Sequence, residues 1–129
     1  MKIKTSLLLF IAIFNVCLYC HNATIAYCQP VGIDTYSNAE IADAIYKAEG
    51  AAKATYAYGI RSIPYKDKAD ARRICLNTIR NNKKRFLKQS KYKDFIVFLG
   101  SRYCPIGCDN DNGTNKYWVK NVMYFLERR

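Results

Sequence analysis

Glu49 is the acidic residue of this 129-residue chain whose position best suits proton transfer. It follows Ile45 by four residues and Ala48 by one, so it lies at the edge of an apolar helical stripe, just before Gly50. A carboxyl group at the border of a core can give a proton to a substrate oxygen and later accept one. The position is compatible with a catalytic acid, although a glutamate at a helix end is more commonly a solvated surface residue.

Three aromatic or glycine-containing motifs follow Glu49 along the chain. Tyr58-Gly59 comes first, Tyr103 closes the apolar segment that ends in Gly-Ser-Arg-Tyr, and Trp118 begins an aromatic-Val-x-x-Val helix. Aromatic rings at such positions can stack on a flat ligand, although aromatic residues at helical spacing also commonly fill a core. We therefore take Tyr58, Gly59, Tyr103 and Trp118 as candidate substrate-binding residues.

The order of Glu49 and these motifs resembles that of the lysozyme-like lytic transglycosylases, over nearly all of the chain after residue 35. The chain is more closely similar to a group of small secreted transglycosylase-like proteins, through residues 48–51, 75–82 and 100–103. The resemblance implies one lysozyme-like domain of the α+β class, mostly helical, over residues 27–129. It also implies cleavage of peptidoglycan glycan strands.

The sequence departs from the broad family pattern at each motif. Gly50 follows the glutamate where serine is usual, and the Gly-Leu-Met-Gln segment survives only as residues 59–61. Tyr103 is kept without its asparagine partner, and Trp118 replaces a tyrosine. The resemblance therefore implies the fold more firmly than the activity, and the alternative function is a non-catalytic, cationic cell-wall glycan-binding protein on the same scaffold.

A second carboxylate, which most glycoside hydrolases need, has no evident position in the sequence. Asp67 and Asp70 open a predicted helix, where they complement its dipole. The remaining acids of the second half stand on other elements: Asp94, Asp109 and Asp111. The resemblance implies a reaction that needs one acid, in which Glu49 protonates the leaving oxygen and then acts as a base. The 6-hydroxyl of the sugar meanwhile closes a 1,6-anhydro ring.

Asn77, Arg80 and Asn81 share one stripe of a predicted helix over residues 67–88. Such polar groups can hydrogen-bond sugar hydroxyls and N-acetyl groups, so they complete the candidate substrate-binding set. The alternative is that they bond within the protein.

The elements that must position these residues are predicted from caps and periodicity. Ser37 and Glu40 form a capping box, which predicts a helix from Ser37 to about Gly50. Residues 56–64 favour a short strand or loop, and residues 92–99 favour a short apolar helix that stops at Gly100. A last helix is predicted from about Asn115, after a turn-rich loop.

Residues 1–26 are predicted to be a secretory signal, with Lys2 and Lys4 before an apolar run over residues 6–19. Cleavage is expected between Cys20 and Ala26, and a lipoprotein signal ending at Cys20 is the alternative. We therefore expect a secreted, periplasmic or cell-envelope protein.

Four cysteines then remain, namely Cys28, Cys75, Cys104 and Cys108. An even number in an exported chain predicts two disulfides, for which three pairings are open. One arrangement closes the loop from Cys104 to Cys108 and ties Cys28 to Cys75. Zinc is the alternative use of these thiols, but the one histidine lies at the signal boundary, so we expect no metal and no cofactor.

The formal net charge of +11 favours polyanionic partners such as acidic cell-wall polymers. A solvated basic surface without a specific partner is the plainer interpretation. Nucleic acid is not an expected partner, because charge and aromatic content are its only support and export argues against it. We expect a monomer that acts on peptidoglycan or a related glycan.

Overall fold

The structure is a computed structural model that describes residues 33–88 and 91–128. Its helices are α2 (Asn38–Ala48), α3 (Lys68–Phe86), α4 (Phe95–Tyr103) and α5 (Trp118–Glu127), with three short 3₁₀ segments, η1 (Ala51–Lys53), η2 (Ala57–Gly59) and η3 (Asn115–Tyr117). No β-strand occurs in the described residues, so the prediction of a mostly helical class is confirmed in this coarse form. The predicted signal segment and Cys28 lie outside the described residues. Within 33–88 and 91–128, no helix has the length and apolarity to cross a membrane.

Helix α2 begins at the predicted capping box. The Ser37 amide donates to Glu40 Oε2 at 2.7 Å, and the Glu40 amide donates to Ser37 Oγ at 3.2 Å. The helix ends at Glu49 because Gly50 adopts φ +102°, a left-handed conformation that glycine adopts without steric cost. Ile41 and Ile45 are fully buried on its inner face. The local sequence thus places Glu49 at the end of a helix whose inner face is buried in the core.

Helix α3 follows the predicted span closely. Asp67 caps its first turn, with Oδ1 accepting from the Asp70 amide at 2.8 Å. Its buried positions recur every three or four residues: Ala71, Cys75, Ile79, Asn82 and Phe86. This spacing is that of one helix face, so the other side of α3 is left to solvent.

Helix α4 differs from the prediction at both ends. It starts at Phe95, after the cap by Asp94, and it continues through Gly100 to Tyr103. Gly100 does not terminate the helix. It lies where α4 packs against α5, and a Cβ at this position would lie 2.6 Å from Val119 Cγ2. The glycine therefore allows α4 and α5 to approach closely, at a position where a helix stop was predicted.

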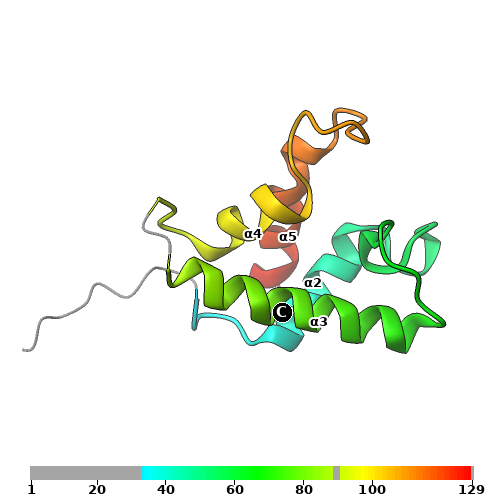
Figure 1. Ribbon diagram of the computed structural model, residues 1–129, viewed down its shortest axis with the longest axis horizontal. Coiled ribbons are helices and arrows are strands. Elements are labelled where there is room, and N and C mark those ends of the chain that lie inside the picture. The colour runs from blue at the N-terminus through cyan, green and yellow to red at the C-terminus, as the bar shows by residue number, and fades with distance from the viewer. Residues whose placement is uncertain (1–32, 89–90, 129) are drawn as a thin grey trace, which may run out of the picture.

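The helices pack around one core, with α2 against both α3 and α5, and α4 against α3 and α5 (Figure 1). The long helix α3 runs along one side of the molecule, and the loop between α4 and α5 projects from the opposite side. Residues 56–64 were predicted as a strand or loop; they form η2 and a loop with bends, with no strand. The projecting loop and the segment that contains η1 and η2 flank the C-terminal end of α2.

Candidate functional site

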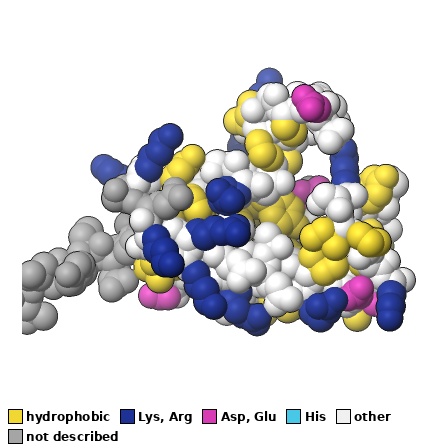
Figure 2. Space-filling view, viewed as in Figure 1, with side chains coloured by type: hydrophobic (Ala, Val, Ile, Leu, Met, Phe, Trp, Pro, Cys, Tyr) yellow, Lys and Arg dark blue, Asp and Glu magenta, His cyan; other side chains and the backbone are white. Residues whose placement is uncertain are grey.

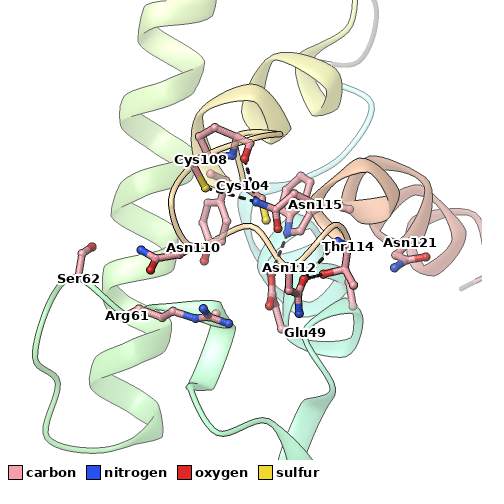
Figure 3. A pocket seen from close by; sticks show the side chains of 15 residues that line it. Glu49, Arg61, Ser62, Cys104, Cys108, Asn110, Asn112, Thr114, Asn115 and Asn121 are labelled. Carbon is pink, nitrogen blue, oxygen red and sulfur yellow. Dashed lines mark hydrogen bonds between the residues drawn. The ribbon is translucent and has the colours of Figure 1, made fainter.

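Glu49 lies in a surface cavity of about 370 Å³ formed between the projecting loop and the segment around η2. This volume is in the range of small-molecule sites. The lining residues are Ala48, Glu49, Gly59, Arg61, Ser62, Tyr103, Cys104, Pro105, Cys108, Asn110, Asn112, Thr114, Asn115, Trp118 and Asn121. Figure 3 shows Glu49 with the polar side chains of this cavity around it, and Figure 2 shows the surface hollowed beside the projecting loop.

Trp118 orients the carboxyl group of Glu49. Its indole Nε1–H donates to Glu49 Oε1 at 2.9 Å, a good geometry for such a bond. Trp118 is the first residue of α5 and only 5% exposed, so its ring is held by packing between α4 and α2. The other oxygen, Oε2, accepts no hydrogen bond from the described residues. The carboxyl group is therefore held through one oxygen by the hydrogen bond from Trp118.

Gly59 packs directly on the same carboxyl group. A Cβ at Gly59 would lie 2.6 to 2.8 Å from the Glu49 carboxyl carbon and oxygens, which is closer than real contacts allow. The residue also has φ +68°, in the left-handed region. The left-handed conformation favours glycine here, and the lack of space means that any side chain would displace the acid.

Tyr103 joins three of the elements around the acid. Its hydroxyl donates to the Tyr58 carbonyl at 2.5 Å, and its ring stacks on that of Trp118 at a centroid distance of 5.3 Å. Burial raises the pKa of Tyr103, so the phenol keeps its proton at neutral pH and remains a donor. Tyr103 therefore ties the end of α4 to η2 and to α5.

Tyr58 does not line the cavity, because its side chain is buried in the core. Its ring is buried, 5.1 Å from that of Tyr46, and its hydroxyl accepts from Arg72 at 3.4 Å. Its φ of +58° places it, with Gly59, in a left-handed pair of residues. Of the four aromatic and glycine candidates, Gly59, Tyr103 and Trp118 line the cavity and Tyr58 does not.

The polar stripe of α3 is not part of this cavity. Arg80 and Asn81 are exposed, and Arg80 donates to Asn77 Oδ1 at 2.8 Å on the solvent side of the helix. Cys75 and Ile79 hold the opposite face of α3 in the core. The three residues share a stripe as the spacing predicted, but the structure does not bring Asn77, Arg80 or Asn81 to Glu49.

The other acids of this region accept hydrogen bonds from backbone amides. Asp111 accepts hydrogen bonds from the amides of Gly107 and Gly113 at 2.8 Å and of Asn115 at 3.2 Å. The Gly107 bond is the largest cause of the lowered pKa of Asp111. Asp94 caps α4, accepting from the Val97 amide at 2.9 Å. Neither acid lines the cavity, so Glu49 is the one carboxylate among the described lining residues.

One wall of the cavity carries amide and hydroxyl side chains that the sequence-based interpretation missed. They come from the projecting loop and from α5: Asn110, Asn112, Thr114, Asn115 and Asn121. Arg61 and Ser62, from the segment that follows η2, were also missed (Figure 3). The density of asparagine in residues 110–115 was the available signal, and it was interpreted only as a turn.

Cys104 and Cys108 are free thiols in the structure, although a bond between them belongs to one of the three pairings that the sequence leaves open. Both line the cavity, and the Asn115 amide donates to Cys108 Sγ at 3.6 Å and to the Pro105 carbonyl at 2.8 Å. The Asn115 side chain thus fastens this loop without a disulfide. Cys75 is likewise free, so the described cysteines form no disulfide in the structure, and Cys28 lies outside the described residues.

The described part of the chain contains no cluster of three or more histidine, cysteine or acidic residues suited to a metal ion. Basic side chains are spread over the outer surface, including the exposed side of α3 (Figure 2). In comparisons with known proteins, no protein-family model, no curated protein and no solved structure matches this chain.

Proposed function

We propose that this protein cleaves glycan strands of the peptidoglycan type as a lytic transglycosylase, with Glu49 as both acid and base. The observation that carries the proposal is one carboxyl group in a surface cavity, oriented by Trp118 and closely packed by Gly59. No second carboxylate lines the cavity among the described residues. The resemblance in motif order supports the same reaction.

The first step is proton donation to the glycosidic oxygen. The indole N–H of Trp118 donates a hydrogen bond to Glu49 Oε1, so we assign the transferred proton to Oε2, which accepts no hydrogen bond from the described residues. A fixed carboxyl group loses little freedom when the bond breaks, because its orientation is already set. The amide-bearing wall supplies neutral donors and acceptors that suit sugar hydroxyls and N-acetyl groups.

The second step uses the carboxylate that proton donation leaves behind. Glu49 takes the proton of the sugar's own 6-hydroxyl, whose oxygen attacks the anomeric carbon and closes the 1,6-anhydro ring. The acid thereby returns to its starting state, so one carboxyl group completes the cycle. A hydrolase would instead use a second carboxylate as a base or nucleophile at a separation of about 5 to 9.5 Å.

The test is the Glu49→Gln variant, which keeps the size of the side chain and removes the proton donor. We expect release of soluble fragments from purified peptidoglycan to fall by at least about 100-fold, the low end for general acid catalysis. Glu127→Gln is the matched control, because Glu127 is exposed at the end of α5 and lies outside the cavity. A folded Glu49→Gln protein that cleaves at the wild-type rate would contradict the proposal. Glycan binding by a wild-type protein without any cleavage would favour the non-catalytic alternative.

A further inference from the structure

Basic residues are concentrated in a stretch of the chain that the candidate site does not use. Residues 71–93 contain many lysines and arginines and no aspartate or glutamate. The first two cations of this stretch are neutralised, because Arg72 pairs with Asp43 and Arg73 pairs with Asp70. The uncompensated charge therefore lies on the C-terminal half of α3 and just beyond it.

Arg80, Lys84 and Lys88 recur every four residues along this half, and all three are exposed. Lys88 follows the last turn of α3, where its amide still donates to the Arg85 carbonyl at 3.0 Å. Four residues of an α-helix rise about 6 Å and make slightly more than one turn, so the three cations form a row about 12 Å long. We call these three residues the basic row. Figure 2 shows lysine and arginine side chains along α3, at the lower edge of the view.

The charges of the basic row have no counter-charge bound to them in the part of the chain that the structure describes. The ion pairs recorded there involve other residues, and Arg80 donates only to the neutral Asn77 Oδ1, at 2.8 Å. Like charges four residues apart on a helix repel one another. The helix dipole favours Lys84 in the last turn, but it acts weakly on Arg80, a full turn earlier. A bound polyanion would replace this repulsion by attraction.

The surroundings of the basic row narrow the class of polyanion. The exposed aromatic side chains of the described residues lie on other segments, so the row offers no ring for base stacking: Tyr56, Tyr117 and Tyr124. Leu87 is the one large apolar side chain exposed next to the row, whereas insertion into a bilayer takes a whole apolar helix face. These features favour a ligand held by repeated charge alone, without bases and without acyl chains.

We propose that the basic row binds a flexible polyol phosphate polymer, with one phosphodiester group at each cation. An ammonium group binds phosphate as a point charge and needs no fixed geometry, which suits a mobile polymer. None of the three residues lines the cavity that contains Glu49, and the loop beside that cavity projects away from α3 (Figure 1). The inference therefore does not depend on the proposed function, and a bound polymer leaves the cavity open.

The test measures binding of a glycerol phosphate oligomer to the full chain by calorimetry at several salt concentrations. Each phosphate contact with a flexible strand contributes about 0.7 to the slope of log K against log salt. The triple variant Arg80→Gln/Lys84→Gln/Lys88→Gln should therefore have a slope shallower by about 2. We also expect its affinity at about 0.15 M salt to be at least tenfold lower than that of the wild type.

The matched control is Lys53→Gln/Lys120→Gln/Arg128→Gln, which removes the same residue types and the same charge at exposed positions outside α3. Its affinity should change by less than about threefold, because only the general field of the protein is reduced. Every substituted side chain is exposed, so both triple variants should remain folded, and circular dichroism checks this. Equal losses in the two variants would overturn the proposal, since net charge alone would then explain binding. Absence of binding by the wild type would also overturn it.

Two further ligands test the assignment of the polymer class. One is a thymidine oligonucleotide with the same number of phosphates, and the other is a vesicle of equal parts phosphatidylglycerol and phosphatidylcholine. We expect neither to bind more tightly than the glycerol phosphate oligomer, because the row lacks exposed rings and an apolar face. Tighter binding of either ligand, lost in the triple variant of the basic row, would overturn the assignment to a polyol phosphate.

Discussion

Trp118 gives Glu49 its orientation through one hydrogen bond, from the indole N–H to Oε1. Because the ring is packed between α2, α4 and the ring of Tyr103, the donor has little freedom to turn away. A hydrogen bond that involves an ionised group contributes about 1.5 to 3 kcal/mol. The same bond also stabilises the carboxylate that forms after proton donation, so removing it should affect turnover more than binding.

Trp118→Phe tests this role, since it keeps most of the ring and removes the N–H donor. We expect kcat for peptidoglycan cleavage to fall by about 10-fold, with KM changed by less than about twofold. Steady-state kinetics on soluble glycan strands measures both constants. Tyr117→Phe is the neighbouring control, because Tyr117 is exposed and outside the cavity. An unchanged kcat in Trp118→Phe would show that the bond does not orient the acid.

Cys75 makes the stability of the reduced protein depend on pH. Burial raises the pKa of its thiol from 9.0 to about 11. Below pH 9 the thiol is neutral in both states, so stability is complete. As pH rises from 9 to 11, the unfolded chain ionises first, and the free energy of unfolding falls by about 2 to 3 kcal/mol. Urea unfolding under reducing conditions at several pH values should show this fall in the wild type.

The control for that measurement is Cys75→Ala, which should be less stable at every pH and lose part of the decline between pH 9 and 11. The difference between the two proteins gives the contribution of the Cys75 thiol to the decline. Other groups that titrate at high pH, such as Tyr103, whose pKa is also raised by burial, contribute equally to both. An identical slope in the two proteins would assign the decline to groups other than Cys75.

At the scale of elements, the site depends on two consecutive residues with a left-handed backbone conformation and on a loop held by side-chain hydrogen bonds. Tyr58 and Gly59 both have positive φ, which turns η2 so that Gly59 meets the Glu49 carboxyl group. Opposite them, Asp111 accepts three amide hydrogen bonds and shapes the asparagine-bearing loop. Glu49 itself is supplied by the end of α2, so three segments far apart in sequence define the cavity.

Gly59→Ala should separate packing against the acid from backbone strain. Gly113→Ala is the matched control, because Gly113 has φ +84° and no atom within 4 Å of an added Cβ. Both variants should lose about 1 kcal/mol of stability from the left-handed conformation. In Gly59→Ala the new methyl group also collides with the Glu49 carboxyl group, which is the far end of a flexible side chain, so we expect the acid to be displaced at little further cost in stability. Denaturant unfolding and peptidoglycan cleavage measure the two effects, and cleavage should be lost only in Gly59→Ala. Equal behaviour of the two variants would contradict the close packing.

The elements were predictable where a local signal defines them. The capping box at Ser37 gave the correct start for α2, since its bonds form between neighbours in sequence, and α3 begins one residue after the predicted Asp67. The end of α4 was not predictable, because Gly100 is required by its contact with α5 and not by a helix stop. Arg61 was missed for a similar reason: its place in the cavity depends on how a loop folds over α2. Glu49, Tyr103 and Trp118 were found through motif order, and their mutual contacts came only with the structure.

For the whole molecule, four described helices enclose one core, and the candidate site lies beside the projecting loop (Figure 1). Basic side chains are spread over the surface outside this site, and the described residues of the cavity include one carboxyl group and one guanidinium. Such a site has an acid for glycosidic cleavage and lacks, among its described residues, the second carboxylate that activates water. The account therefore predicts the identity of the product as well as the site of cleavage.

Digestion of purified peptidoglycan in water enriched with heavy oxygen, followed by mass spectrometry of the fragments, tests this central claim most directly. If the internal 6-hydroxyl is the acceptor, the fragments end in 1,6-anhydromuramic residues and carry no label, as we predict. Labelled reducing ends would contradict the account, because they would show that water attacks the anomeric carbon and that another carboxylate takes part.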